Sequence, residues 1–194
     1  MYDVVGELQK IKESIETLIG DPVKLLQIEL LAQLIVQALG EGNKILLMGN
    51  GGSAADAQHL AAEFVSRFNY DRPGLAAIAL TTDTSILTAI GNDYGYDRLF
   101  ARQVQALGNQ GDILIGISTS GTSKNIIAAF NEAKNKNILT IGMCGESVGQ
   151  FDLLCDHVFR APAVTTPKIQ EIHIIVGHIL CGLVESSIFP RSDF

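Results

Sequence analysis

The sequence predicts an α/β fold, a three-layer sandwich in which about five parallel strands lie between helices. Segments of helical periodicity alternate with short apolar segments after residue 42. The apolar segments are continuous runs of Ile, Leu and Ala, which is typical of strands that are covered on both faces. Two of them also end in turns rich in glycine or hydroxyl groups, as ligand-binding strands of such sheets do.

Residues 1–42 are expected to form an N-terminal helical pair, because apolar residues recur there at helical spacing. The first stripe consists of Val4, Leu8, Ile11, Ile15 and Leu18, and the second of Leu25, Ile28, Leu31, Ile35 and Leu39. Gly20-Asp21-Pro22 breaks and restarts the helix. Few charges flank these stripes, so the pair is expected to serve both packing and oligomerisation.

Residues 43–194 are expected to form the sandwich itself, ending in a long helix. Strands are predicted at 44–49, 75–81, 112–117, 137–143 and near 157–160. Helices are predicted at 53–67, in pieces over 84–107, at 123–135 and over 166–188. No linker or repeat divides the 194 residues, so we expect one domain.

Composition restricts the classes of function. A net charge of −7 and a pI near 5.0 disfavour nucleic acid and anionic membranes as partners, so a phosphate must be held locally. No apolar run approaches the roughly 20 residues that cross a bilayer. Cys144, Cys155 and Cys181 are odd in number, with neither Cys-x-x-Cys spacing nor a basic targeting run. We therefore expect a cytoplasmic protein with reduced cysteines.

The segment 112–125 carries the most informative pattern, because an apolar strand runs into hydroxyl groups and then into a helix. The hydroxyls are those of Ser118, Thr119, Ser120, Thr122 and Ser123. A helix N-terminus offers unpaired N–H groups and a positive dipole end, so this turn predicts a phosphate cradle. The alternative is that Ser120 or Thr122 simply caps the helix, which needs one hydroxyl.

A second turn, Gly49-Asn50-Gly51-Gly52-Ser53, also leads from a strand into a helix. Its glycines permit positive φ and close approach of a ligand to the backbone. The turn matches neither the Walker pattern nor Gly-x-Gly-x-x-Gly, so a nucleotide is not the expected ligand. Because both turns follow strand ends, we expect them to face one cleft.

These two turns on an α/β sandwich resemble the sugar isomerase (SIS) family, whose phosphosugar-binding domains are doubly wound and flavodoxin-like. Further residues make nearly the whole chain similar to the phosphoheptose isomerases of that family, namely Gln58-His59, Glu63, Gly91-Asn92-Asp93, Ile169-Gln170-Glu171-Ile172-His173 and His178. The resemblance implies isomerisation of sedoheptulose 7-phosphate to D-glycero-D-manno-heptose 7-phosphate. This is the first step of ADP-heptose biosynthesis for the lipopolysaccharide core.

Such a reaction moves a proton between C1 and C2, and needs a base, an acid and a group that stabilises the oxyanion. His59 and Glu63 are four residues apart, and Gln170 and His178 are eight apart, so each pair lies near one helix face. The resemblance implies that these four residues hold one zinc ion per subunit. It also implies that Glu63 is the base and His178 the acid, although ligation of zinc competes with proton transfer at both.

The same resemblance implies a set of substrate contacts. Four hydroxyl residues would hold the phosphate, Asn92 and Asp93 would hold sugar hydroxyls, and the full set is Asn50, Gly51, Gly52, Glu63, Asn92, Asp93, Ser118, Thr119, Ser120, Ser123 and Gln170. The alternatives are a turn residue for Asp93 and a core histidine for His59. His157 and His173 are expected to be structural. Pro167 stands where some relatives carry an acid.

Family members form homotetramers with active sites at subunit interfaces, so the resemblance implies the same assembly here. One rival interpretation is a non-catalytic SIS relative that binds the replication initiator protein. In that relative the places matching Glu63 and His178 have lost the catalytic residue types, whereas both are present here. Another rival is an isomerase or lyase for a different sugar phosphate.

Overall fold

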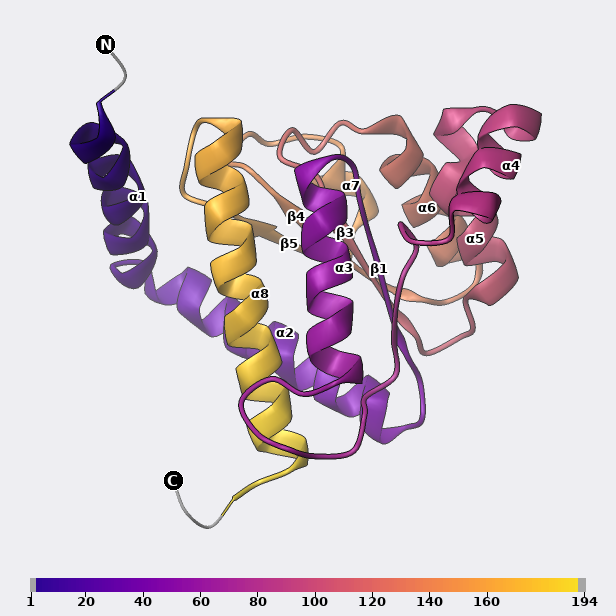
Figure 1. Cartoon of the computed structure of the whole chain (residues 1–194), viewed down its shortest axis with the longest axis horizontal. Coiled ribbons are helices and arrows are strands. Elements are labelled where there is room, and N and C mark those ends of the chain that lie inside the picture. The colour runs from indigo at the N-terminus through magenta and orange to yellow at the C-terminus, as the bar shows by residue number, and fades with distance from the viewer. Residues whose placement is uncertain (1–2, 192–194) are drawn as a thin grey trace.

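A computed structural model describes residues 3–191, in which a parallel sheet lies between two layers of helices (Figure 1). The strands are β1 (Ile45–Gly49), β2 (Ala77–Ala79), β3 (Ile113–Ile117), β4 (Leu139–Cys144) and β5 (His157–Arg160). Their order is β2-β1-β3-β4-β5, and each neighbouring pair is parallel. This is the flavodoxin-like order, so the predicted doubly wound sandwich is confirmed.

The strand order reverses between β1 and β3, which are neighbours in the sheet although β2 lies between them in sequence. Gly49 at the end of β1 is paired with Ile117 at the end of β3, so the two carboxyl ends are level. Ligands of open α/β sheets bind at this kind of switch point. The glycine-rich turn and the hydroxyl-rich turn therefore begin side by side.

Two layers of helices cover the sheet. One layer contains α2 (Pro22–Gly40), α3 (Gly52–Val65) and α8 (Thr166–Ile188), with α1 (Val4–Ile19) against α8. The other contains α4 (Thr84–Tyr94), the 3-10 turn η1 (Tyr96–Arg98), α5 (Leu99–Leu107), α6 (Lys124–Asn135) and the short α7 (Phe151–Leu154). Leu46 and Leu114 face the layer that contains α5 and α6. Leu47 and Ile115 face the layer that contains α2, α3 and α8. Both faces are thus buried, which explains the continuous apolar runs.

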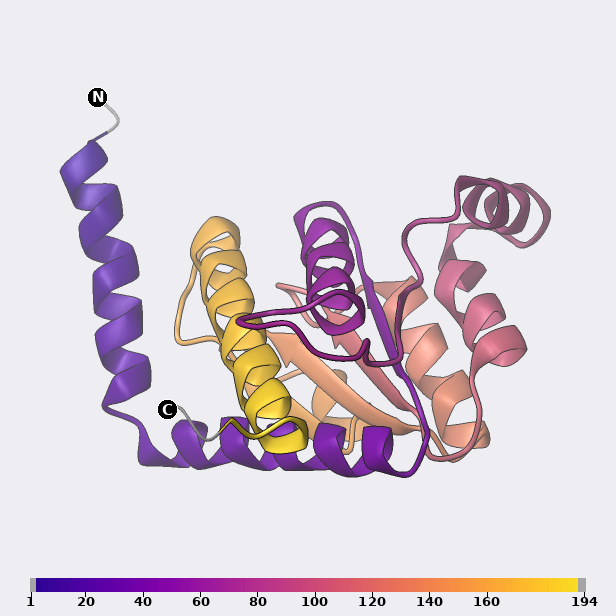
Figure 2. The same ribbon diagram turned by 60° about the horizontal axis from the view of Figure 1, so that its bottom comes forward.

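The N-terminal helical pair is present where it was predicted, and each helix begins at an aspartate cap. Asp3 accepts hydrogen bonds from Val5 and Gly6 at the start of α1, and Asp21 accepts them at the start of α2, where Pro22 follows. Figure 2 shows α1 projecting from the end of α2, away from the sheet. Several apolar residues on this pair are more than 60% exposed, namely Val4, Val5, Leu8, Ile19, Val23 and Leu26.

The expectation that no segment is long and apolar enough to cross a membrane is wrong for two described helices. By length and composition alone, α2 and α8 are long and apolar enough to cross a membrane. Each meets this criterion through its average hydropathy, without an uninterrupted apolar run. Both nevertheless contribute to the core on one face of the sheet. Core helices commonly satisfy the same criterion, so the finding is weak evidence for a membrane.

The remaining predictions of the elements hold, with small differences. The helical pieces over 84–107 are α4, η1 and α5, and α7 was not predicted because four residues show no periodicity. Cys144, Cys155 and Cys181 are free. Burial raises the pKa of Cys155 and of Cys181 to about 12, so both thiols are protonated at neutral pH.

Candidate active site

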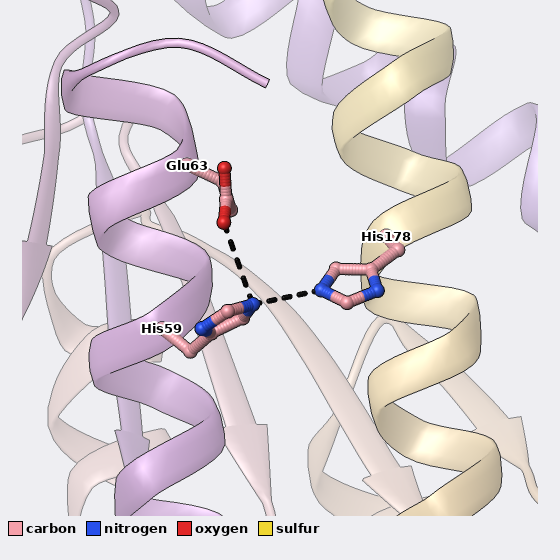
Figure 3. Close-up of side chains that lie close together, drawn as sticks. All are labelled: His59, Glu63 and His178. Atoms are coloured by element: carbon pink, nitrogen blue, oxygen red, sulfur yellow. Dashed lines mark hydrogen bonds and ion pairs between the residues drawn. The ribbon is translucent and has the colours of Figure 1, made fainter. Parts of the chain in front are cut away.

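His59, Glu63 and His178 converge between two neighbouring helices (Figure 3). His59 and Glu63 lie one turn apart on α3, and His178 lies on α8. Nε2 of His59 is 2.8 Å from Nε2 of His178 and 3.4 Å from Oε1 of Glu63. One ligand atom of each residue lies within 4.8 Å of the others. The structure thus brings together the two histidines and the glutamate among the predicted metal ligands.

A glycine lets the two helices approach at this point. A Cβ atom placed on Gly177 would lie 2.6 Å from a methyl carbon of Leu60, which is too close for an unperturbed side chain. Gly177 precedes His178, and Leu60 follows His59. The close contact of α3 and α8 therefore carries the two imidazoles toward each other.

The donor set fits a zinc ion. Zinc is bound by histidine nitrogen and carboxylate oxygen at about 2.0–2.2 Å, which puts neighbouring tetrahedral ligands roughly 3.3 Å apart. Two of the observed separations, 2.8 and 3.4 Å, lie within about half an ångström of that value, and all three ligand atoms lie within 4.8 Å of one another. In addition, Nε2 of His59 faces both a carboxylate and another imidazole nitrogen, and a single proton cannot serve both. A cation would satisfy all three groups.

Gln170 contacts the first turn of α3. A Cβ atom on Gly52 would lie 2.6 Å from Nε2 of Gln170, so the amide packs over the first residue of α3. Gly52 precedes His59 by seven residues, or about 10 Å along the helix. Gln170 therefore lies beside the glycine-rich turn. Pro167 occupies the first turn of α8, where proline is tolerated because the N–H group has no helical partner.

The hydroxyl-rich turn is organised by its own side chains. The hydroxyl of Ser118 lies 3.0 Å from that of Ser123, and the hydroxyl of Ser120 lies 2.9 Å from that of Thr122. Ser123 is the N-cap residue of α6, but its side chain makes no capping hydrogen bond. The alternative that Ser120 or Thr122 caps the helix is wrong. The start of α6 therefore keeps the anion-attracting character that the sequence predicted.

The glycine-rich turn is joined to the hydroxyl-rich turn by two amides. Nδ2 of Asn50 donates to Oδ1 of Asn125 (3.0 Å), and Nδ2 of Asn125 donates to Oδ1 of Asn50 (2.8 Å). Gly51 has a φ of +56° and is the N-cap of α3, again without a side-chain cap. Two helix N-termini thus meet at the switch point.

Two residues of this region were not singled out from the sequence. Asn125 lies two residues after the hydroxyl-rich turn ends at Ser123, so its position was a usable signal. Tyr96 donates a hydrogen bond of 2.9 Å to Oδ1 of Asn50 from η1, and no sequence pattern indicated it.

A pocket of about 420 Å³ adjoins the hydroxyl-rich turn. It is lined by Thr119, Ser120, Gly145, Glu146, Ser147, Ala163, Val164, Thr166 and Ile169. The lining comes from the carboxyl ends of β3 and β4 and from the connection into α8. Thr119 and Ser120 therefore face a space of the size that small ligands occupy.

Asn92 and Asp93 lie in the last turn of α4, and their side chains are joined by a hydrogen bond of 2.8 Å. The alternative of a turn for Asp93 is therefore wrong, because the turn begins two residues later at Gly95, with φ of +83°. Tyr96 follows at once and reaches Asn50, which brings this end of α4 toward the glycine-rich turn. Both side chains are exposed.

Two buried polar groups lie near the site. Asp56 is three residues before His59, and its Oδ2 has no hydrogen-bond partner among residues 3–191. Burial raises the pKa of Asp56, against the opposing charge of His59. His173 is buried on α8, where its Nε2 lies 3.1 Å from the carbonyl oxygen of Cys144, as suits a structural residue. His157 is the first residue of β5, where it is paired with Ile141 of β4.

The doubly wound sheet has two helix N-termini without side-chain caps at its switch point, which suits an anionic ligand. The model of the SIS domain family matches residues 8–145, so this chain is a protein of the SIS class. The chain is 57% identical over 187 residues to a phosphoheptose isomerase from Burkholderia pseudomallei (strain 1710b), covering 96% of this chain and 93% of that relative. It is 58% identical over 179 residues to a phosphoheptose isomerase from Aneurinibacillus thermoaerophilus, covering 92% and 90%. This chain belongs to the phosphoheptose isomerase family.

The solved structures agree with this assignment. The structure is similar to that of a phosphoheptose isomerase from Francisella tularensis, with a TM-score of 0.86 and 38% sequence identity. The match covers 94% of this chain and 95% of that one. The resemblance found in the motifs is confirmed over nearly the whole length.

Proposed function

We propose that this chain interconverts sedoheptulose 7-phosphate and D-glycero-D-manno-heptose 7-phosphate, and so supplies heptose for ADP-heptose and the lipopolysaccharide core. The observation that carries this proposal is the convergence of Glu63 and His178 in a member of this family. A carboxylate and an imidazole at one place are the acid and base that a shift of a proton between neighbouring carbons requires.

In this proposal the hydroxyl-rich turn binds the phosphate end of the substrate, and the three converging residues act on the end that carries C1 and C2. We assign the phosphate to Ser118, Thr119, Ser120 and Ser123, since hydroxyls and helix N–H groups are donors for an anion. Asn50, Gly51, Gly52, Asn92, Asp93 and Gln170 would contact the sugar. The Gln170 amide packs over Gly52, the first residue of α3, beside the glycine-rich turn. We assign Gln170 a contact with the sugar there, in addition to its role as a metal ligand.

In the proposed reaction Glu63 takes a proton from C1 or C2, and His178 donates a proton to the carbonyl oxygen. Zinc, held by His59, Glu63 and His178, with Gln170 as the fourth ligand by resemblance, would polarise the substrate oxygens. A group that ligates a metal does not transfer protons freely, so the roles of Glu63 and His178 must be ranked by mutation.

We also propose a homotetramer in the cytoplasm, in which residues 1–194 act as one SIS unit. The exposed apolar residues of α1 and α2 support burial against other subunits. Although the family match ends at residue 145, α8 packs into the same core as β1 and β3, which supports one unit.

A non-catalytic role in binding the replication initiator is the alternative. The convergence of Glu63 and His178 supports the enzyme, because a scaffold has no need of that geometry.

The test is turnover of sedoheptulose 7-phosphate by the purified chain, with chelator and with added zinc, followed by NMR of the aldose product. Zinc-dependent formation of the heptose phosphate is expected. Absence of turnover with any metal, from folded protein that still binds the phosphosugar, would contradict the enzyme and favour the scaffold. Turnover of a hexose phosphate alone would favour a different sugar phosphate.

A further inference from the structure

Arg72 and Glu185 form a buried ion pair beyond the three converging residues. Nε of Arg72 donates to Oε1 of Glu185 at 3.1 Å, and the two side chains are 2% and 1% exposed. A buried ion pair by itself is weak evidence of a contribution to stability, because desolvation offsets the attraction. What distinguishes this pair is the set of groups that it connects.

The guanidinium of Arg72 binds the carboxyl end of α3. Its Nη2 donates to the carbonyl oxygen of Glu63 (2.8 Å), and its Nη1 donates to those of Phe64 (2.6 Å) and Ser66 (3.2 Å). The last carbonyls of a helix lack partners within the helix, and a cation there is stabilised by the helix dipole. Arg72 therefore fixes the turn of α3 that carries the Glu63 side chain.

Glu185 binds the chain that follows α3. Its carboxylate accepts hydrogen bonds from the N–H groups of Phe68 (2.8 Å) and Asn69 (2.7 Å). The Phe68 ring in turn packs against the His178 ring, with 5.5 Å between centroids. Burial would raise the pKa of Glu185, but these hydrogen bonds and Arg72 outweigh it and lower that pKa. Glu185 is thus held as a carboxylate.

Glu185 also lies seven residues, about two turns, after His178 on α8, so both side chains lie near the same face of that helix. The pair consequently connects α8 with the end of α3 and with the ring that packs on His178. We infer that Arg72 and Glu185 are positioning residues, which set the separation and orientation of Glu63 and His178 without contacting the substrate. The inference concerns the proposed site but does not need the proposed reaction to be correct.

The test compares Arg72→Lys and Glu185→Gln with a matched control in the full chain. Arg72→Lys keeps the charge and loses the planar fork that reaches several carbonyls. The control is Asp112→Asn, because Asp112 is a carboxylate that is 1% exposed and paired with Lys44. Like Glu185 it accepts backbone N–H groups near the amino ends of the strands, but its donors are Lys44 and Asn109, which precede β1 and β3, and not the chain that follows α3.

The first readout is the NMR signal of the His59 and His178 rings in metal-free protein at one fixed pH. We expect both signals to shift in Arg72→Lys and in Glu185→Gln, and to stay in place in Asp112→Asn. Unshifted ring signals in either folded variant of the pair would overturn the inference. Equal shifts in the control would overturn it as well, because they would indicate a general loosening of the fold.

The second readout is the affinity for zinc, measured by competition with a chromogenic chelator, beside the affinity for inorganic phosphate. We expect zinc affinity to fall about tenfold or more in the two variants, as for other residues that orient ligands, with phosphate affinity unchanged. Zinc affinity equal to that of the unmodified chain would overturn the inference. An unmodified chain without heptose turnover would contradict only the proposed function, since neither readout requires turnover.

Discussion

His59 and His178 are 119 residues apart in the sequence, yet their Nε2 atoms lie 2.8 Å apart. The contact exists because α3 and α8 pack side by side on one face of the sheet, with Leu60 against Gly177 (Figure 1). Glu63 joins them from the next turn of α3. The chemistry that we propose therefore depends on one interface between helices, which gives the following predictions.

Glu63→Gln is expected to abolish most turnover while the phosphosugar still binds. The amide keeps the shape of the side chain but cannot accept the proton, and general bases contribute roughly 10²- to 10⁴-fold to rate. Steady-state kinetics and calorimetric titration with sedoheptulose 7-phosphate check this. Glu132→Gln, at a partly buried position of α6, is the matched control and should behave like the unmodified chain. Unchanged turnover in Glu63→Gln would remove that residue from the mechanism.

Ser118→Ala is expected to weaken binding of phosphate and to raise KM more than it lowers kcat. Its hydroxyl lies 3.0 Å from that of Ser123 at the start of α6, and a hydrogen bond to a charged group contributes about 1.5–3 kcal/mol. Binding of inorganic phosphate should therefore fall roughly 10- to 100-fold. Ser187→Ala, on an exposed turn of α8, is the control. Equal phosphate affinity in both variants would place the phosphate elsewhere.

Leu26→Glu is expected to dissociate the proposed homotetramer. Leu26 is 64% exposed on α2, so a charge costs little in the separate chain but would be unfavourable in a subunit interface. Light scattering at micromolar concentration gives the mass. Gln33→Glu, at another exposed position of α2, should leave the assembly intact. A monomeric mass for the unmodified chain would contradict the proposed tetramer itself.

The stability of the fold is expected to fall as the pH decreases from 6.5 toward 4, because of His173. Burial lowers the pKa of His173 from 6.5 to about 4, and its Nδ1 has no hydrogen-bond partner in the described part of the chain. In this range the unfolded chain binds a proton that the folded protein does not, so the neutral imidazole stabilises the fold fully only above pH 6.5. The loss between pH 7 and pH 5 should be about 2 kcal/mol.

Urea denaturation at a series of pH values measures this effect. His173→Leu should have a flatter dependence of the free energy of unfolding on pH, whatever its absolute stability. His157→Gln, at a partly buried position on β5, should retain the dependence of the unmodified chain. An unchanged slope in His173→Leu would show that other groups are responsible.

Much of the site could be predicted from local sequence. The hydroxyl-rich and glycine-rich turns each lie between a strand and a helix, so local pattern was sufficient to find them. The convergence of His59 and Glu63 with His178 was expected only from the resemblance, since spacing alone places each pair on its own helix. No sequence pattern indicated a role for Arg72 or Glu185. A single arginine is common in a loop, and a single glutamate is common in a helix, so neither residue stands out locally.

The sequence by itself determined the alternation of strands and helices and the two turns, because continuous apolar runs, helical periodicity and glycine act over a few residues. Only the tertiary structure decided the strand order that sets Gly49 level with Ile117, the pairing of Asn50 with Asn125, and the place of Gln170 beside Gly52. These relationships join residues that are far apart in the chain. They arise when the helices bury their apolar faces on the sheet. The hydrophobic effect that drives this burial is non-directional, so the local sequence does not show which distant polar groups it brings together.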